Sequence, residues 1–208
     1  MMITNAREDP AQPVPTLLRS LNCDGRYGLT LLAVLGFLGL LAAGGSRWAA
    51  SLRYEPAAIR AGEWWRLLTA HGVHLGARHL LLDTAGLVLL WVLYARELRP
   101  LNWLLLLVGA TAAIDAGLWW GEPQLQWYVG ISGLLHAGWA AGAAAAAMRG
   151  QRAGWIMLVL LAIKLAVEQH AGGSLVTEAF AVVTAAHRYG ALGGLLAVAA
   201  LALWRKPL

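Results

Sequence analysis

Long apolar runs with very few charges recur along this chain, and short segments that carry arginine, glutamate, proline or tryptophan separate them. A helix needs about 20 mostly apolar residues to cross the hydrocarbon core of a bilayer. Six runs approach this length, so the pattern predicts an all-α membrane protein with six transmembrane helices. We expect these helices at about residues 28–49, 79–94, 101–120, 132–148, 155–170 and 178–204.

Two segments depart from this pattern. Residues 1–27 are polar or mixed and contain three closely spaced prolines, which predicts a flexible tail ahead of a six-span domain at 28–208. The segment between the first two predicted helices combines four arginines with tryptophans, the mixture expected at a lipid–water interface. We therefore expect a loop embedded in the membrane surface. Its arginines and tryptophans are Arg47, Arg53, Arg60, Arg66, Trp48, Trp64 and Trp65.

Composition supports a membrane protein and narrows the classes of function. Of the 208 residues, 59% are hydrophobic and 13% are charged, which is far from an average soluble domain. The net charge of +5 comes mainly from arginines at the ends of apolar runs, so it indicates topology and lipid contact. The strings of basic and aromatic residues typical of nucleic-acid binders are absent from the sequence. The single cysteine, Cys23, excludes an internal disulfide and a cysteine-based metal cluster.

The distribution of basic residues predicts the orientation of the helices. Cytoplasmic loops are enriched in lysine and arginine, and the segments after the second, fourth and sixth predicted helices contain such residues. They are Arg96, Arg99, Arg149, Arg152, Arg205 and Lys206. Residues 121–129 and 171–177 contain none, so we place both loops outside the cell, although the arginine-rich first loop breaks the rule. This topology puts the start of the fourth helix near the outer surface.

Several ionisable side chains fall inside or beside apolar runs, where they are costly and therefore candidates for function. His79 and Asp83 are four residues apart, so they share one face of a helix. Hydrogen bonds at the membrane surface would explain this pair as well as a catalytic role does. Zinc binding by His71, His74 and His79 is disfavoured, because the chain has no His-Glu-x-x-His string. No metal site is therefore expected.

Four further charges lie in apolar surroundings, and pairing explains them best. Lys164 and Glu168 are four residues apart and are predicted to form an ion pair along one helix. Asp115 and Arg188 are predicted to pair between two helices. Both pairs would neutralise charge rather than perform chemistry. The same charges would suit a small transporter, but the chain has no detectable internal repeat, which disfavours that function.

A serine and a histidine carry the strongest candidate chemistry. Ser132 lies between Gly130 and Gly133 at the predicted start of the fourth helix. Free backbone N–H groups there can stabilise an oxyanion, and the glycines let a substrate carbonyl approach. His187 lies in the sixth apolar run and would act as general base if it reached the serine. Such a string also arises by chance or from tight helix packing, and a buried histidine is often satisfied by a backbone carbonyl.

Small residues predict how the fourth and sixth helices meet. Gly190 and Gly194 follow His187 at a spacing that lets two helices approach closely. Gly138 and Gly142 offer a matching face on the fourth helix. We therefore expect these two helices to touch and to bring the histidine to the serine.

Taken together, these residues resemble the rhomboid family of intramembrane serine proteases. Three blocks occur in the order of the family over about residues 63–194. They are Trp65-Arg66-Leu67-Leu68-Thr69 followed by His74, His79 and Asp83; Gly130-x-Ser132-Gly133; and Ala186-His187-x-x-Gly190-x-x-x-Gly194. The resemblance implies a rhomboid-like bundle that needs no cofactor. In it Ser132 is the nucleophile, His187 is its base, and His79 supports the oxyanion beside the serine N–H.

The chain departs from the family pattern at two positions. Asp83 stands where the family usually has asparagine, and an ionised carboxylate cannot donate a hydrogen bond to an oxyanion. Either Asp83 is protonated through burial, or it orients a histidine, or the oxyanion relies on His79 and the backbone; we favour the orienting role. Ala137 replaces a glycine that usually follows the serine motif, but alanine is small enough for close packing.

The compact six-span form and the Ser-Gly-Leu-Leu-His string that begins at Ser132 are similar to the rhombosortase branch. That resemblance implies exported, membrane-anchored protein substrates whose C-terminal tail has a Gly-Gly motif, one apolar span and a basic end. It also implies the inner membrane of a Gram-negative bacterium, where the predicted topology puts the active site near the periplasmic side. We expect the substrate tail to enter sideways between the second and fifth helices. The alternatives are an ordinary rhomboid protease of single-span proteins and a non-catalytic rhomboid-like protein that binds membrane segments.

Overall fold

The structure, a computed structural model, describes residues 16–171 and 183–204. Within these ranges every regular element is a helix, so the predicted all-α class is confirmed. Strand-like pairing is limited there to one isolated bridge between Tyr54 and Tyr128. The helices are α1 (Thr16–Ser20), α2 (Gly25–Ala43), α3 (Gly45–Leu52), α4 (Pro56–Arg60), α5 (Arg66–Thr69), α6 (Ala77–Tyr94), α7 (Pro100–Gly121), α8 (Ser132–Met148), α9 (Arg152–Ala171) and α10 (Thr184–Trp204).

Long apolar helices make up most of the molecule. Among the described residues, α2, α6, α7, α9 and α10 are each long and apolar enough to cross a bilayer. The helix α8 has 17 residues, which is the lower limit of the length that a bilayer core requires. The chain is therefore a multi-span membrane protein, and the count of six spans stays a prediction.

Helix boundaries follow the predicted ones except in the first and last spans. The first span is shorter than the predicted 28–49, because α2 ends at Ala43 and Gly45, with a φ of +59°, turns the chain into α3. A positive φ is a conformation that favours glycine and interrupts a helix. At the other end of the chain α10 begins at Thr184. Residues 178–182 of the predicted sixth span lie outside the described part.

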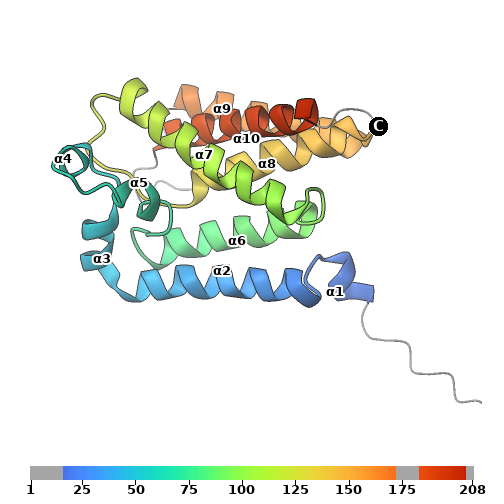
Figure 1. The fold of residues 1–208 in the computed structure, drawn as a ribbon, viewed down its shortest axis with the longest axis horizontal. Coiled ribbons are helices and arrows are strands. Elements are labelled where there is room, and N and C mark those ends of the chain that lie inside the picture. Colours follow the sequence, from blue (N-terminus) through green and yellow to red (C-terminus); the bar gives the residue numbers. More distant parts are fainter. Residues whose placement is uncertain (1–15, 172–182, 205–208) are drawn as a thin grey trace, which may run out of the picture.

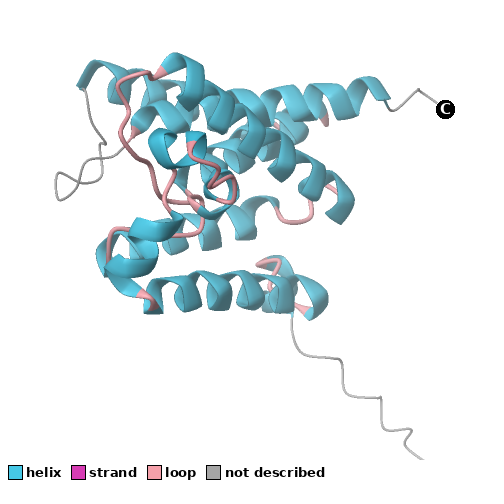
Figure 2. Ribbon diagram, turned by 60° about the vertical axis from the view of Figure 1, so that its left-hand side comes forward, coloured by secondary structure: helices cyan, strands magenta, loops and turns pink. Residues whose placement is uncertain are grey.

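The helix α10 packs against α7, α8 and α9 (Figure 1). Its buried face consists mainly of alanine and glycine. The residues of this face are Ala185, Ala186, His187, Gly190, Ala191, Gly193, Gly194 and Val198. The helix α6 also contacts α8, and α2 lies at the edge of the molecule beside α6 (Figures 1 and 2). Small side chains on this face therefore let α10 approach its neighbours closely.

Close approach of α8 and α10 positions the candidate site. A Cβ atom added at Gly190 would lie 2.0 Å from the carbonyl oxygen of Gly133. One added at Gly194 would lie 2.3 Å from the carbonyl oxygen of Ala137. Only glycine fits at these two positions without a shift of backbone. The predicted contact between the fourth and sixth spans is thus present in the structure.

The prediction that Gly138 and Gly142 form the α8 side of this contact was wrong. A Cβ at Gly142 would lie 2.3 Å from the ring of Tyr94, and the nearest atom to a Cβ at Gly138 belongs to Leu90. Both neighbours are on α6. The reason is helical rotation, because Gly138 follows the α10-facing position of α8 by one residue, which turns it by about 100°.

A buried arginine fixes the loop between α2 and α6, which contains α3, α4 and α5. Arg66 is 7% exposed and donates to the carbonyl oxygens of Ala50 and Arg53 at 3.0 and 2.9 Å. Its Nε lies 2.7 Å from a carboxylate oxygen of Glu63. The exposed tryptophans of this loop are Trp48, Trp64 and Trp65. Exposed indoles suit the predicted place at the membrane surface.

The last part of the predicted N-terminal tail is attached to the bundle. Residues 1–15 lie outside the described part, whereas Asn22 lies against α6. Its side-chain amide donates to the carbonyl oxygen of Val92 at 2.7 Å, and its side-chain oxygen accepts from Arg96 at 2.9 Å. The indole of Trp91 donates to its backbone oxygen at 2.9 Å. Contacts to the bundle thus begin before residue 28.

Candidate active site

Ser132 is the first residue of α8 and ends a tightly held turn. Gly130 has a φ of +114°, its carbonyl oxygen accepts from the Tyr128 hydroxyl at 2.6 Å, and its N–H donates to Ala70 at 3.0 Å. Burial and the charge of Asp83 raise the pKa of the Tyr128 phenol, so this donor stays protonated. The first N–H groups of a helix have no acceptor within it. The turn therefore presents the Ser132 hydroxyl at the N-terminus of α8.

His187 on α10 faces this serine. Its Nε2 atom lies 3.0 Å from Oγ of Ser132, and the histidine is 3% exposed. In a neutral imidazole one nitrogen donates and the other accepts. An accepting Nε2 receives the hydrogen of the serine hydroxyl. The structure thus brings together the two residues that the sequence singled out, although 55 positions separate them.

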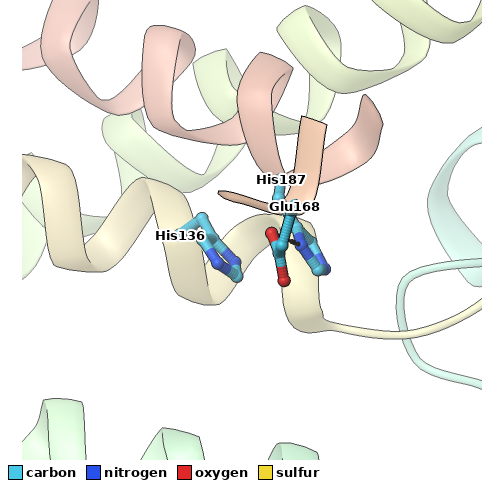
Figure 3. Close-up of side chains that lie close together, drawn as sticks. All are labelled: His136, Glu168 and His187. Atoms are coloured by element: carbon cyan, nitrogen blue, oxygen red, sulfur yellow. Dashed lines mark hydrogen bonds and ion pairs between the residues drawn. The ribbon is translucent and has the colours of Figure 1, made fainter. Parts of the chain in front are cut away.

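Glu168 on α9 continues the series of hydrogen-bonded groups formed by Ser132 and His187, and Figure 3 shows it beside His187. Its Oε2 lies 2.9 Å from Nδ1 of His187, and its Oε1 lies 2.5 Å from Nζ of Lys164. The predicted ion pair with Lys164 is therefore present, but neutralisation does not describe Glu168 fully. Sequence reasoning missed the contact with His187. Its signal was a carboxylate inside an apolar helix, whereas the partner depends on how α9 packs against α10.

A second histidine lies flat against the ring of His187. The ring centroids of His136 and His187 are 4.0 Å apart and their planes are inclined by 11° (Figure 3). Nδ1 of His136 lies 2.7 Å from the backbone oxygen of Ser132, one helical turn earlier. This bond holds the ring of His136, which in turn covers one face of His187. The spacing of four residues from Ser132 was the available signal for this residue.

Asp83 lies between two histidines next to the turn before α8. Its Oδ2 is 3.2 Å from Nε2 of His74 and 3.3 Å from Nε2 of His79. The N–H of Leu75 donates to Nδ1 of His79 at 3.3 Å, so His79 carries its ring hydrogen on Nε2, toward Asp83. A Cβ at Gly130 would lie 2.9 Å from the His79 ring. Of the three roles considered for Asp83, this geometry fits orientation of a histidine.

The predicted ion pair between Asp115 and Arg188 was wrong. Oδ1 of Asp115 lies 3.3 Å from Nε2 of His71. Arg188 donates to the side chain of Gln169 and lies 3.4 Å from Glu122. Successive residues of a helix differ in direction by about 100°, so Arg188 points away from the buried face of α10. Sequence spacing alone does not show which faces of two different helices lie opposite each other in the bundle.

One group of side chains could geometrically hold a metal ion. Donor atoms of His136, Glu168 and His187 lie within 4.8 Å of one another. Other contacts account for this closeness, because Glu168 bonds to His187 and the ring of His136 stacks on that of His187. The three histidines considered from the sequence lie elsewhere, and two of them face Asp83.

A hydroxyl, an imidazole and a carboxylate in series, buried among apolar helices, define a serine-hydrolase type of site in a membrane protein. The family model described as "Rhomboid domain" matches residues 61–204, and the chain belongs to the rhomboid family. It is similar to "Putative rhomboid protease YdcA" of Bacillus subtilis (strain 168), with 28% identity over 144 residues. That match covers 65% of this chain, and the chain spans 66% of the length of that relative. No solved structure matches the chain.

Membership of the family confirms the rhomboid resemblance inferred from three motif blocks. All three blocks fall within the matched residues 61–204. The rhombosortase branch, the substrate class and the membrane in which the protein resides stay predictions.

Proposed function

We propose that this protein is an intramembrane serine endopeptidase that uses Ser132 as nucleophile and His187 as general base. The observation that carries the proposal is the 3.0 Å approach of Nε2 to Oγ at the partly buried junction of α8 and α10. A nucleophile and a base within hydrogen-bond reach are the minimum equipment for acyl transfer. Membership of the rhomboid family and the name of the Bacillus subtilis relative support the same activity.

The reaction follows from the positions of these two side chains. Oγ of Ser132 attacks the carbonyl carbon of the scissile bond while its proton passes to Nε2 of His187. The C–N bond breaks, the amine leaves with that proton, and the acyl group stays on the serine as an ester. Water then attacks the ester, gives a proton to His187, and the serine recovers its hydrogen.

Negative charge that develops on the substrate oxygen needs donors. The N–H of Ser132 at the start of α8 provides one, and the Nε2–H of His79 beside Gly130, shared between Asp83 and the substrate oxygen, provides a second. Asp83 holds His79 in orientation and accepts rather than donates. Removal of one oxyanion donor costs about 3 kcal/mol of transition-state stabilisation.

The substrates are membrane-anchored proteins, and the sequence favours the rhombosortase type. These are exported proteins with a C-terminal Gly-Gly motif, one apolar span and a basic end. The tail enters sideways between α6 and α9, both of which contact the helix that bears Ser132. Arginines at the opposite end of that helix support a cytoplasmic location for that end, and with it a site near the periplasmic side of a bacterial inner membrane.

A reporter with a Gly-Gly motif, an apolar span and a basic end tests the proposal. The purified wild type, Ser132→Ala and His187→Ala are each reconstituted with this reporter or with a single-span substrate that lacks the glycines. Mass spectrometry identifies the products. We expect the wild type to cleave near the glycines and both variants to fold without cleaving.

Each other outcome has a definite meaning. Cleavage by either purified variant excludes the dyad. Cleavage of the second substrate alone indicates an ordinary rhomboid protease with a different substrate class. An intact reporter and an intact single-span substrate, together with binding of either, favour a non-catalytic protein that holds membrane segments.

A further inference from the structure

The carboxylate of Glu168 is buried and has two different partners. The residue is 1% exposed, although it lies on an apolar helix. A buried carboxylate is stable only when it is paired and hydrogen-bonded. One oxygen meets the ammonium of Lys164 at 2.5 Å and the other meets Nδ1 of His187 at 2.9 Å. The ion pair with Lys164 explains the first contact and leaves the second unexplained.

We propose that Glu168 is a positioning residue that holds His187 in the tautomer in which Nε2 accepts the proton of Ser132. The proposal rests on the proposed protease function and adds a third member to its dyad. A neutral imidazole has a single N–H. When that hydrogen is on Nδ1 and points at Glu168, the lone pair of Nε2 points at the serine hydroxyl, 3.0 Å away.

The surroundings of His187 leave its ring little freedom to turn. His136 covers one face of the ring at 4.0 Å and is itself held by the backbone oxygen of Ser132. The in-plane bond to Glu168 fixes the direction of Nδ1. Stacking alone would allow either tautomer, since it does not distinguish the two nitrogens. Glu168 is the group that makes this choice.

Lys164 decides which oxygen of Glu168 serves the histidine. An ammonium group is a donor with no acceptor, so it retains an oxygen atom at the position of Oε1. In Glu168→Gln the single remaining oxygen is therefore drawn to Lys164, and the amide NH₂ group faces Nδ1 of His187. Nδ1 must then accept, Nε2 carries the hydrogen, and the serine loses its base. When Lys164 is also replaced, the amide of the glutamine at position 168 can rotate so that its oxygen accepts from Nδ1 of His187.

Three variants test this reasoning in the full-length protein. They are Glu168→Gln, the double variant Glu168→Gln with Lys164→Met, and Glu97→Gln as matched control. Glu97 is a glutamate paired with Arg149 at the opposite end of α8. The measurements are kcat and KM on the cleaved reporter, the rate at which a fluorophosphonate probe labels the serine, and thermal unfolding.

We expect Glu168→Gln to lower kcat and the labelling rate by about 100-fold or more, with KM unchanged. Glu97→Gln should match the wild type. The kcat of the double variant should be at least about tenfold higher than that of Glu168→Gln. A kcat for Glu168→Gln within tenfold of the wild type would overturn the proposal, as would a loss that follows the unfolded fraction alone. A double variant as slow as Glu168→Gln would overturn the role of Lys164.

The tautomer can be observed without any turnover. Nitrogen NMR of protein labelled at its six histidines distinguishes a protonated Nδ1 from a protonated Nε2, and comparison with His187→Ala assigns the signal. We expect a protonated Nδ1 in the wild type and a protonated Nε2 in Glu168→Gln. The same tautomer in both proteins would refute the inference. A wild type that neither cleaves nor labels would instead refute the proposed function, while the NMR result still decides the tautomer.

Discussion

Substitution of Gly190 by alanine should increase the distance between Ser132 and His187 without removing either side chain. The added Cβ would lie 2.0 Å from the carbonyl oxygen of Gly133, a backbone atom that cannot rotate away. Gly133 follows Ser132 directly, and Gly190 is three residues from His187. The clash therefore lies within one helical turn of both reactive side chains, and the only relief is a shift of α10 away from α8.

The size of that shift follows from the geometry. Ordinary contact begins at 3.4 Å, so the two backbones must separate by about 1.4 Å. A shift of this size lengthens the 3.0 Å contact between Ser132 and His187 to about 4 Å or more, beyond hydrogen-bond reach. Misplacement of reacting groups by about 1 Å costs about 100-fold in rate. Overpacking of a close helix contact costs about 1–3 kcal/mol of stability.

The assay compares kcat for reporter cleavage and the rate of fluorophosphonate labelling in folded protein. Gly109→Ala is the matched control, because Gly109 lies on α7 with no neighbouring atom within 4 Å of an added Cβ. We expect Gly190→Ala to lose about 100-fold in both rates and the control to lose neither. A Gly190→Ala protein with the kcat of the wild type would refute the argument that this helix contact sets the catalytic distance.

Two further substitutions test the supports of the site. Arg66→Ala should lower the free energy of unfolding by about 3 kcal/mol or more, because the loop then loses charge-assisted bonds to two backbone carbonyls. Denaturant or thermal unfolding measures this loss, and an unchanged midpoint would contradict it. Asp83→Asn should lower kcat about tenfold, because His79 loses a charge-assisted bond worth about 1.5 kcal/mol. A higher kcat would mean instead that the asparagine amide supplies an oxyanion donor that the carboxylate of Asp83 lacks.

Most of the fold could be predicted because membrane spans are defined by properties of the chain itself. The length and apolarity of residues 101–120 predict α7, whose observed limits, Pro100–Gly121, differ from the predicted ones by one residue at each end. The error at the first span arose where Gly45 adopts a positive φ inside an otherwise continuous apolar run. Hydropathy does not distinguish a glycine that continues a helix from one that turns the chain.

The candidate site could be predicted only as far as sequence spacing reveals contacts. Spacing of four residues identifies neighbours along one helix, and on this basis the pairing of Lys164 with Glu168 was found. The contact of Glu168 with His187 crosses from α9 to α10 and has no spacing rule. The same limit explains the wrong partner assigned to Asp115, whose true neighbour is His71 on a distant segment.

The buried series that runs from Lys164 through Glu168 and His187 to Ser132 also indicates what kind of help the carboxylate gives. Lys164 already compensates the negative charge of Glu168, since their atoms are 2.5 Å apart. The histidine therefore faces an ion pair rather than an isolated charge, which weakens any general electrostatic stabilisation of its protonated form. The ion pair leaves the direction of the hydrogen bond to Nδ1 unchanged, because that direction depends on the position of one oxygen atom of Glu168. Orientation, more than charge, is thus the contribution that this arrangement preserves.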